Sequence, residues 1–215
     1  MMGWGEGSGV YYCSMILKNK LNITDQVELA KAEEKISKQK AKQLFDSGDI
    51  KKVEVGTFDG LSYIQNYLFS DIYDFSGKIR DVNISKGDFR FVPVMYLDSA
   101  LKNISNMPHT NVETIIDKYV EMNIAHPFRE GNGRATRIWL DLIFKKELKQ
   151  VIDWNLVGKE AYLSAMTRSV VNALEIKTLL KGALTSDIDN RTLFMKGIDV
   201  SYFYEGYSEF NIEDV

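Results

Sequence analysis

Twelve consecutive residues, 126–137, hold most of the side chains in this chain that could do chemistry. They read His-Pro-Phe-Arg-Glu-Gly-Asn-Gly-Arg-Ala-Thr-Arg. The ordinary pKa of a histidine, roughly 6.5, suits His126 to act as a general base at neutral pH. Glu130 offers a carboxylate oxygen to Mg²⁺, an ion that binds few protein carboxylates and keeps water and phosphate in the rest of its shell. The segment therefore combines a proton acceptor with a candidate magnesium ligand.

The same segment has the features of a phosphate site. Gly131, Asn132 and Gly133 can cradle one phosphate, because glycine permits the positive φ angles that turn successive N–H groups toward an anion. Arg134 and Arg137, on successive turns of one helix, can bind two more phosphates. Neither a cysteine nor a serine is placed as a nucleophile, so direct transfer to an external hydroxyl is the natural inference.

Each of these groups, taken alone, has a plainer interpretation. The histidine could be structural, the glutamate a surface charge, the glycines a turn and the arginines a solvated face. Their combination within one short segment at the start of a helix favours a magnesium–nucleotide site with a base.

Two predicted helices position this segment. The upstream helix, about 111–125, has apolar residues at helical spacing and Asn111 as its N-cap. The downstream helix has an apolar stripe from Ile138 to Ile143 and lysines near its C-terminus, where the helix dipole favours cations. The glycines therefore lie at the N-terminus of the second helix, which carries roughly half a positive charge and free N–H groups.

Further helices are predicted on both sides of this pair, over about 24–47, 58–68, 98–107, 159–168, 172–184 and 189–205. The charged run 31–42 in the first of them is typical of a solvated helix face. Gly197 lies inside the last one and costs about 1 kcal/mol in a helix interior. We therefore expect a break or kink there, with a short final helix at about 200–205.

Residues 84–94 alternate polar and apolar side chains around Lys86-Gly87-Asp88, which predicts a β-hairpin in an otherwise helical chain. Two interpretations are open from the pattern alone. The hairpin could be an ordinary exposed turn, or its edge could bind an extended peptide by strand addition.

The composition is that of a soluble globule: 215 residues, 45% hydrophobic and 27% charged, with a net charge of −3. This charge argues against nucleic-acid binding. Cys13 is the single cysteine, which excludes an internal disulfide and suits a reducing compartment. No apolar run reaches the roughly 20 residues of a membrane span. We expect a cytoplasmic protein with a loose N-terminal segment, 1–22, and one domain, 23–215. Residues 10–17 could form a short strand or an apolar tail docked on the core.

Three segments of the chain resemble the Fic family. Residues 126–137 match every defined position of its motif, His-Pro-Phe-x-(Asp/Glu)-Gly-Asn-Gly-Arg-x-x-Arg. Residues 75–80, 83–87 and 89–91 resemble the segment that leads into the flap hairpin of the family. Residues 201–206, Ser-Tyr-Phe-Tyr-Glu-Gly, resemble the inhibitory motif (Ser/Thr)-x-x-x-Glu-(Gly/Asn). In the compact bacterial class this motif follows the catalytic core, and the resemblance covers about 52–206.

This resemblance implies an all-α Fic fold, with about eight helices around a central helix-loop-helix and one small β-hairpin flap. The implied activity is AMPylation, the transfer of AMP from ATP, with Mg²⁺, to a Tyr, Ser or Thr hydroxyl of a target protein. His126 would deprotonate the hydroxyl and Glu130 would bind Mg²⁺. The nucleotide would be bound by Gly131, Asn132, Gly133, Arg134 and Arg137. Lys86 and Gly87 would cover it from the flap, along which the target protein would lie.

Other functions stay open beside this one. The same pocket could remove AMP from a modified protein or transfer a different nucleotide. The chain could also be an inactive scaffold or a nucleotide-sensing module, although the intact His126, Glu130 and Arg137 argue against that.

The resemblance also implies control by the C-terminal helix, about 200–206. Ser201 and Glu205 are four residues apart and share a helix face, and Glu205 would pair with Arg137 in place of the γ-phosphate. A surface glutamate in an amphipathic helix is the plainer alternative. A 100-fold inhibition needs about 2.7 kcal/mol of preference for the closed state. We expect Tyr202 to be the site of self-modification, and a homo-oligomer, dimer or tetramer, to pin the helix.

Overall fold

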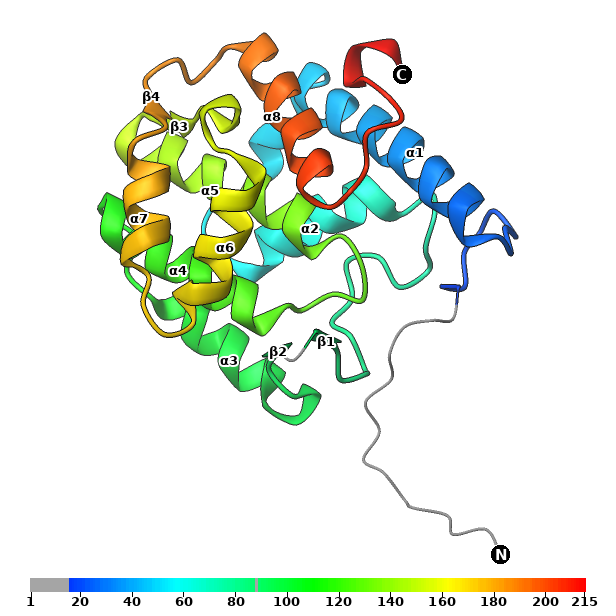
Figure 1. The fold of residues 1–215 in the computed structure, drawn as a ribbon, viewed down its shortest axis with the longest axis horizontal. Coiled ribbons are helices and arrows are strands. Elements are labelled where there is room, and N and C mark those ends of the chain that lie inside the picture. The colour runs from blue at the N-terminus through cyan, green and yellow to red at the C-terminus, as the bar shows by residue number, and fades with distance from the viewer. Residues whose placement is uncertain (1–15, 88) are drawn as a thin grey trace, which may run out of the picture.

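The computed structural model describes residues 16–87 and 89–215, and over these it is mainly helical (Figure 1). Its α-helices are α1 Gln26–Asp46, α2 Phe58–Phe69, α3 Val94–Asn106, α4 Val112–Ala125, α5 Asn132–Leu148, α6 Lys159–Ser169, α7 Leu174–Lys181 and α8 Arg191–Tyr204. Short 3-10 helices are η1 Asp49–Lys52, η2 Trp154–Leu156 and η3 Ile212–Asp214. The strands are β1 Ser85–Lys86, β2 Phe89–Arg90, β3 Val151–Ile152 and β4 Leu184–Thr185. The predicted all-α fold with about eight helices and a small hairpin is confirmed.

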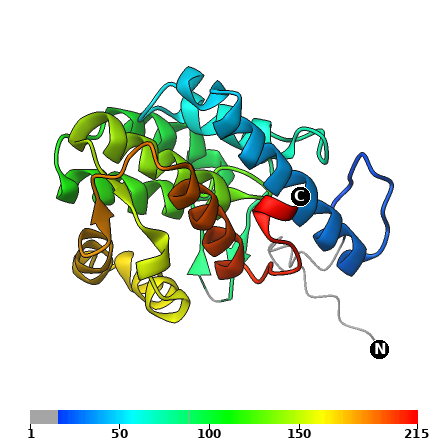
Figure 2. The same ribbon diagram turned by 90° about the horizontal axis from the view of Figure 1, so that it is seen from above.

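Helix α5 forms the centre of the molecule. It packs against α2, α4 and α8, and every residue from Arg134 to Leu140 is buried. A helix that is buried on all sides is normally apolar all round, but this one carries two arginines in its first two turns. Seen from above in Figure 2, α8 and the C-terminal residues lie alongside α1. The centre of the fold therefore holds charge that its neighbours must satisfy.

The loop between α4 and α5 is bracketed by two residues with left-handed backbone. Helix α4 starts at a capping box, in which the N–H of Thr114 donates to Asn111 Oδ1 at 2.9 Å, and it ends at His126 with φ of 48°. Helix α5 starts after Gly131, whose φ is 75°. A Cβ at Gly131 would collide with the ring of Phe69, so this turn requires glycine. The chain thus reverses within a few residues and brings both helix ends to one place.

The flap hairpin is present where the sequence predicts it. Strand β1 pairs antiparallel with β2, with Ser85 opposite Arg90 and Lys86 opposite Phe89. A second ladder joins β3 to β4, with Val151 opposite Thr185. The sequence pattern did not predict this second ladder, because its strands are separated by α6 and α7 and no local turn signal joins them.

Helix α8 runs without interruption through Gly197, so a break there, with a separate short final helix, is wrong, whereas a kink at this residue stays a prediction. A Cβ at this position would lie 3.1 Å from Trp154 Cδ1. The glycine therefore permits a close contact between α8 and η2 instead of ending the helix. Helix α3 starts at Val94 and not near residue 98, and α7 is shorter than predicted because Leu184 belongs to β4.

Residues 1–15 are outside the described part of the chain, so the predicted strand or tail at 10–17 falls largely outside it. Leu17, Leu21 and Ile23 pack against the core, and the N–H of Lys20 donates to Ile72 O at 2.8 Å. The domain boundary near residue 22 stays a prediction. None of the described helices combines the length and the apolar character needed to cross a bilayer.

Candidate active site

His126 is held between helix α4 and the flap. Its Nδ1 lies 3.3 Å from the carbonyl oxygen of Asn123, and its ring stacks on Phe91 with 3.8 Å between ring centroids. When Nδ1 carries the proton and donates to that carbonyl, Nε2 keeps a free lone pair. Burial is the main cause that lowers the pKa of His126 to about 4, with Arg80 and Lys86 adding to the effect. The imidazole is therefore neutral at neutral pH and can accept a proton.

Arg80 connects the flap to the end of helix α4 by binding backbone carbonyls only. Its Nε donates to His126 O at 2.8 Å and its Nη1 to Val82 O at 2.7 Å. Its Nη2 donates to the carbonyl oxygens of Val92 and Ala125. The side chain is 2% exposed, and burial lowers its pKa. One guanidinium thus fixes both ends of the flap and the peptide of the candidate base.

The phosphate-type loop is closed by its own asparagine. Asn132 Oδ1 accepts the N–H of Phe128 at 2.8 Å, and Asn132 Nδ2 donates to Phe128 O at 2.8 Å. Because the predicted phosphate ligand Asn132 uses its side chain in this way, its contribution to an anion comes from the backbone at the start of α5. The loop is therefore shaped before any ligand binds.

Glu130 has one engaged and one available carboxylate oxygen. Its Oε1 accepts the N–H of Gly131 at 2.7 Å and pairs with Arg134 Nη2 at 2.6 Å. Its Oε2 makes no hydrogen bond within the described residues. Burial raises the pKa of Glu130 to about 7. The described residues contain no group of three or more His, Cys, Asp or Glu that could hold a metal. A lone carboxylate with a free oxygen fits Mg²⁺, which takes its other ligands from phosphate and water.

Arg134 is fully enclosed by three carboxylates from three helices or their ends. Its Nη1 pairs with Glu33 at 2.8 Å and its Nη2 with Glu130 at 2.6 Å. Its Nε lies 2.9 Å from Glu205 Oε2. These carboxylates hold the pKa of Arg134 well above its ordinary value, against the opposing effect of burial. The guanidinium is therefore fixed and permanently charged.

Glu33 was not predicted as a site residue, and the run 31–42 is only in part the solvated face that the sequence suggested: Lys31 and Lys35 are exposed, whereas other charged residues of the run are buried. Glu33 and Glu34 are each 2% exposed and Lys38 is 1% exposed. Glu33 also accepts a hydrogen bond from Tyr207 at 3.0 Å and one from Tyr73. The charged pattern on α1 serves contacts with α5, α8 and the residues after α8.

Arg137 is bound by Ser201 and Glu205, as the inhibitory motif implies. Its Nε donates to Ser201 Oγ at 2.6 Å, and its Nη2 donates to Ser201 O at 2.9 Å and pairs with Glu205 Oε1 at 2.5 Å. Burial would raise the pKa of Glu205, but the charges of Arg134 and Arg137 hold it below its usual value. The carboxylate of Glu205 is therefore ionised at neutral pH.

Glu205 also covers the N-terminus of α5. A Cβ at Gly133 would collide with Glu205 Oε1, so the carboxylate lies directly over this glycine. The position is the one where a helix N-terminus attracts an anion. A protein carboxylate thus occupies the place that the sequence suggests for a phosphate.

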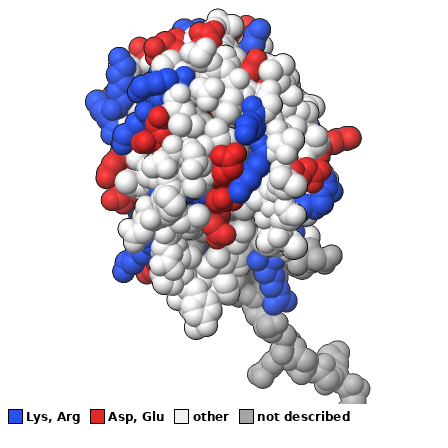
Figure 3. Space-filling view, turned by 90° about the vertical axis from the view of Figure 1, so that its left-hand side faces the viewer, with Lys and Arg blue, Asp and Glu red and all other residues white. Residues whose placement is uncertain are grey.

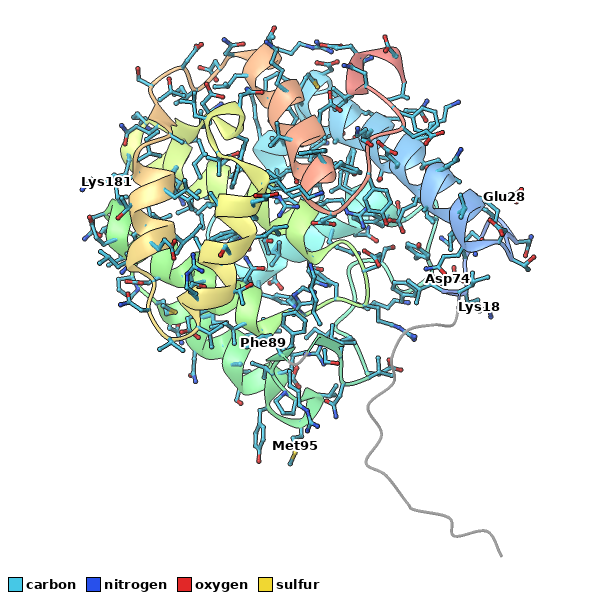
Figure 4. The ribbon with its side chains drawn as sticks, viewed as in Figure 1. Lys18, Glu28, Asp74, Phe89, Met95 and Lys181 are labelled. Atoms are coloured by element: carbon cyan, nitrogen blue, oxygen red, sulfur yellow. The ribbon has the colours of Figure 1, made fainter. Side chains whose placement is uncertain are left out.

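The remaining predicted residues lie at the edges of this site. Lys86 and Gly87 are exposed at the tip of the flap, where Phe89 is drawn at the same end of the molecule as Met95 of α3 (Figure 4). Tyr202 is 1% exposed and lies between Lys38 and Arg134, each 5.2 Å from its ring centroid. The structure therefore brings together the motif, Ser201 and Glu205, and places Tyr202 behind them.

Comparison with known proteins identifies the family. The Fic/DOC family matches residues 57–144. The chain is 30% identical over 175 residues to the probable protein adenylyltransferase Fic of Salmonella typhimurium, with 75% of this chain and 84% of the relative covered. It is 26% identical over 197 residues to the probable protein adenylyltransferase Fic of Escherichia coli, with 86% and 96% covered.

Solved structures agree on the fold. The BepC protein of Bartonella tribocorum, solved with bound AMPPNP, superimposes with a TM-score of 0.64 at 21% identity, covering 82% of this chain and 95% of that one. Sequence, fold and motif geometry agree, and the chain belongs to the Fic/DOC family.

Proposed function

We propose that this protein is an adenylyltransferase that moves AMP from ATP to a tyrosine, serine or threonine hydroxyl of a target protein. The observation that carries the proposal is a neutral His126 beside a helix N-terminus and two buried arginines. The names of the curated relatives and the AMPPNP bound to the related BepC protein support the same nucleotide chemistry.

The proposed reaction uses His126 as the base. Its Nε2 accepts the proton of the target hydroxyl while that oxygen bonds to the α-phosphorus. The bond from the α-phosphorus to the oxygen bridging the β-phosphorus breaks, and pyrophosphate leaves. Arg134, Arg137 and the backbone N–H groups at the start of α5 hold the phosphates. Glu130 would hold Mg²⁺, which neutralises phosphate charge when bound.

We also propose that Glu205 inhibits the enzyme. In the closed arrangement its carboxylate occupies the anion position over Gly133 and forms ion pairs with both motif arginines. A γ-phosphate would need the same donors on Arg137, so ATP could bind only in an unproductive pose. A preference of about 2.7 kcal/mol for this state gives 100-fold inhibition, and one partly buried ion pair with neighbours is enough for that.

The residues after α8, here called the C-terminal strap (207–215), support this closed state. Glu34 on α1 accepts the N–H of Glu209 at 3.1 Å. Lys38 on α1 pairs with Asp199 of α8 at 2.8 Å and donates to Phe210 O. Strap, α8 and α1 are thus joined through buried polar groups within one chain. The predicted dimer or tetramer would add to this restraint and stays a proposal.

Self-modification at Tyr202 is proposed as a consequence of opening. The hydroxyl of Tyr202 is buried in the closed state and has no hydrogen-bond partner within the described residues. It can reach a nucleotide only after α8 leaves its position. Modification of Tyr202 would then prevent the helix from docking again, because its closed position has no room for AMP.

The test is labelling with α-phosphate-labelled ATP and Mg²⁺. A Glu205→Gly variant, at a helix end where glycine is well tolerated, is expected to label itself and lysate proteins far more than the wild type. The double variant Glu205→Gly, His126→Ala lacks both the inhibitory carboxylate and the base, and it is expected to lose the label. Label that persists without His126 contradicts the proposed base, and absence of AMP on every protein with Glu205→Gly contradicts the inhibition.

Two further measurements test self-modification at Tyr202 and removal of AMP separately. Peptide mass spectrometry of the Glu205→Gly variant should find AMP on Tyr202, and its absence there would reject that site alone. Incubation with an AMP-modified protein and Mg²⁺ but no ATP tests the reverse activity. Release of AMP in that assay without forward labelling would favour AMP removal as the function.

A further inference from the structure

A cavity of about 770 Å³ lies between α5, α8, β3 and the C-terminal end of α1. This volume is typical of small-molecule sites. Arg137 and Ser201 belong to its lining, whereas His126, Glu130 and Gly133 do not. The cavity therefore reaches the inhibitory contact from outside the nucleotide site.

Apart from Arg137, Ser201 and Asp141, the interior of this cavity is mostly apolar. Its walls come from four parts of the chain and include Ile50, Val53, Ile138, Leu142, Phe194 and Ile198. The carboxylate of Asp141 also lies in the wall, where it accepts hydrogen bonds from Trp154 Nε1 at 2.8 Å and from the N–H of Ile152 at 3.1 Å. Because both oxygens of Asp141 are engaged, the wall is suited to an apolar ligand body.

The solvent side of the cavity carries unpaired positive charge. Its opening is lined by three exposed lysines, Lys51, Lys146 and Lys149. None of the three forms an ion pair at 4.0 Å or less with a carboxylate of the described residues. The helix dipole favours lysines at the end of α5, but Lys51 converges on the same cavity from η1.

The carboxylates on this side already have partners. Asp46 pairs with Arg191 and Asp189 with Lys145, each at 2.7 Å. Asp187 accepts a hydrogen bond from Asn190, which leaves its charge, so three lysines face one uncompensated carboxylate. The available charge at the opening is therefore positive.

We propose that this cavity binds a small amphiphilic anion of the fatty-acid type. Its apolar chain would lie between α5 and α8, and its carboxylate would lie at Lys51, Lys146 and Lys149. An apolar interior with a cationic opening matches a ligand that is apolar at one end and anionic at the other.

The ligand would act on α8, and this step rests on the proposed inhibition by Glu205. Leu193, Phe194, Gly197, Ile198 and Ser201 of α8 form one wall. A ligand that contacts α5 and α8 together binds the docked helix better than the released one. By linkage it stabilises the docked state and strengthens inhibition.

Binding is tested on the full chain with decanoate as the probe, by calorimetry and thermal unfolding. Decanoate is expected to bind with one-site saturation and to raise Tm, whereas decanol and inorganic phosphate at equal concentration do not. If decanol raised Tm as much as decanoate, the lysines would not contribute to binding. If phosphate did so, the apolar interior would not contribute. Either result overturns the proposal.

Variants then locate the site. The double variant Lys51→Glu, Lys146→Glu should weaken decanoate binding about tenfold or more, and Leu193→Trp should abolish it by filling the cavity. Lys102→Glu on α3, outside the cavity, should bind decanoate like the wild type. The lysines are exposed, so their replacement leaves folding intact and keeps the test valid if Leu193→Trp misfolds. Unchanged affinity in the lysine double variant overturns the proposal.

Activity supplies the last readout. Decanoate should lower the residual labelling of lysate proteins by the wild type and leave their labelling by Glu205→Gly unchanged, although it still raises the Tm of that variant. Binding without any effect on wild-type labelling overturns the link to α8. Failure of every variant to label would count against the proposed function and not against the cavity, whose binding is measured without ATP.

Discussion

At the residue scale, the central feature is one guanidinium held by a protein carboxylate, with which a γ-phosphate would compete under the proposed function. Arg137 uses its Nε and Nη2 on Ser201 and Glu205 in the closed state. Arg134 is shared in the same way, but Glu33 and Glu130 would keep it charged and fixed after Glu205 leaves. Under the proposed inhibition, Arg137 would therefore have to exchange its partners for ATP to bind productively, whereas Arg134 would keep Glu33 and Glu130.

The lowered pKa of His126 predicts the acid side of the pH profile. A base must be unprotonated to act, and a pKa of about 4 keeps this histidine neutral well below neutrality. At saturating Mg²⁺, which keeps Glu130 ionised against its raised pKa of about 7, initial rates of labelling by Glu205→Gly should therefore change little between pH 8 and pH 6. A fall in rate with a midpoint near 6.5, the ordinary histidine value, would show that the base is not buried in the working enzyme.

Removing the charge of Glu33 should destabilise the fold. Glu33→Gln leaves a hydrogen-bonding side chain but takes one carboxylate from the buried Arg134, so the free energy of unfolding should fall by about 1–3 kcal/mol. Urea unfolding measures this change. Glu28→Gln, an exposed change on the same helix, should stay within about 0.5 kcal/mol. Equal effects of the two changes would mean that Glu33 is not important for Arg134.

The motif residues could be predicted from sequence because they are contiguous, whereas their supports could not. Glu33 meets Arg134 across 101 positions of sequence, and its charged neighbours on α1 suggested a solvated face. Arg80 binds backbone carbonyl oxygens. Because every residue has one, the sequence does not show which residues are its partners. A single chain without relatives shows which groups can react but not which distant groups hold them.

At the scale of elements, α8 and the C-terminal strap act as one unit on α1. Lys38 is the residue that joins all three, through Asp199 of α8 and the carbonyl of Phe210. Glu34, which also binds the strap, pairs with Lys38 at 3.0 Å. The helix that carries Glu205 is thus held at its middle as well as at its end.

Replacing Lys38 should release α8. Lys38→Met leaves Asp199 and Glu34 without their cation, and breaking a buried ion pair typically costs about 3–5 kcal/mol. Basal labelling should rise toward the level of Glu205→Gly, because this cost exceeds the preference of about 2.7 kcal/mol that would hold α8 docked. Lys40→Met on the same helix loses a pair with Asp71, away from α8, and is the matched control. A lower Tm without a rise in labelling would separate stability from inhibition.

The positions of most helices followed from their apolar spacing, and the exceptions have local causes. Gly197 suggested a helix end, but its missing side chain accommodates Trp154. A glycine can end a helix or permit close packing against it. Only the position of Trp154, which the sequence does not give, decides between the two. The β3–β4 ladder depends on two segments that meet only after α6 and α7 are placed.

At the scale of the whole molecule, charge is mixed over the surface and concentrated inside. Acidic and basic side chains are interspersed on the face shown in Figure 3, in keeping with the net charge of −3. The buried charges gather around α5 and join α1, α8 and the strap. Overall stability should therefore respond to pH through interior groups.

Asp141 gives a specific stability profile. Burial raises its pKa to about 7, although its bonds to Trp154 and Ile152 oppose this. Between its unfolded pKa of about 3.9 and 7 the folded state binds more protons than the unfolded state, so stability falls as pH rises through this range. The total fall should be roughly 2–4 kcal/mol. Asp141→Asn should flatten this part of the profile in urea unfolding between pH 5 and pH 8, and an unchanged slope would contradict the assignment.

Arg80 has a consequence for how targets are told apart. The same side chain secures both ends of the flap and the peptide of His126. If a target strand binds to the flap and orders it, Arg80 would align His126 at the same time. A target that fits the flap poorly would bind but react slowly, so discrimination would appear in kcat more than in KM. The choice of partner would be made during the chemical step and not at the moment of encounter.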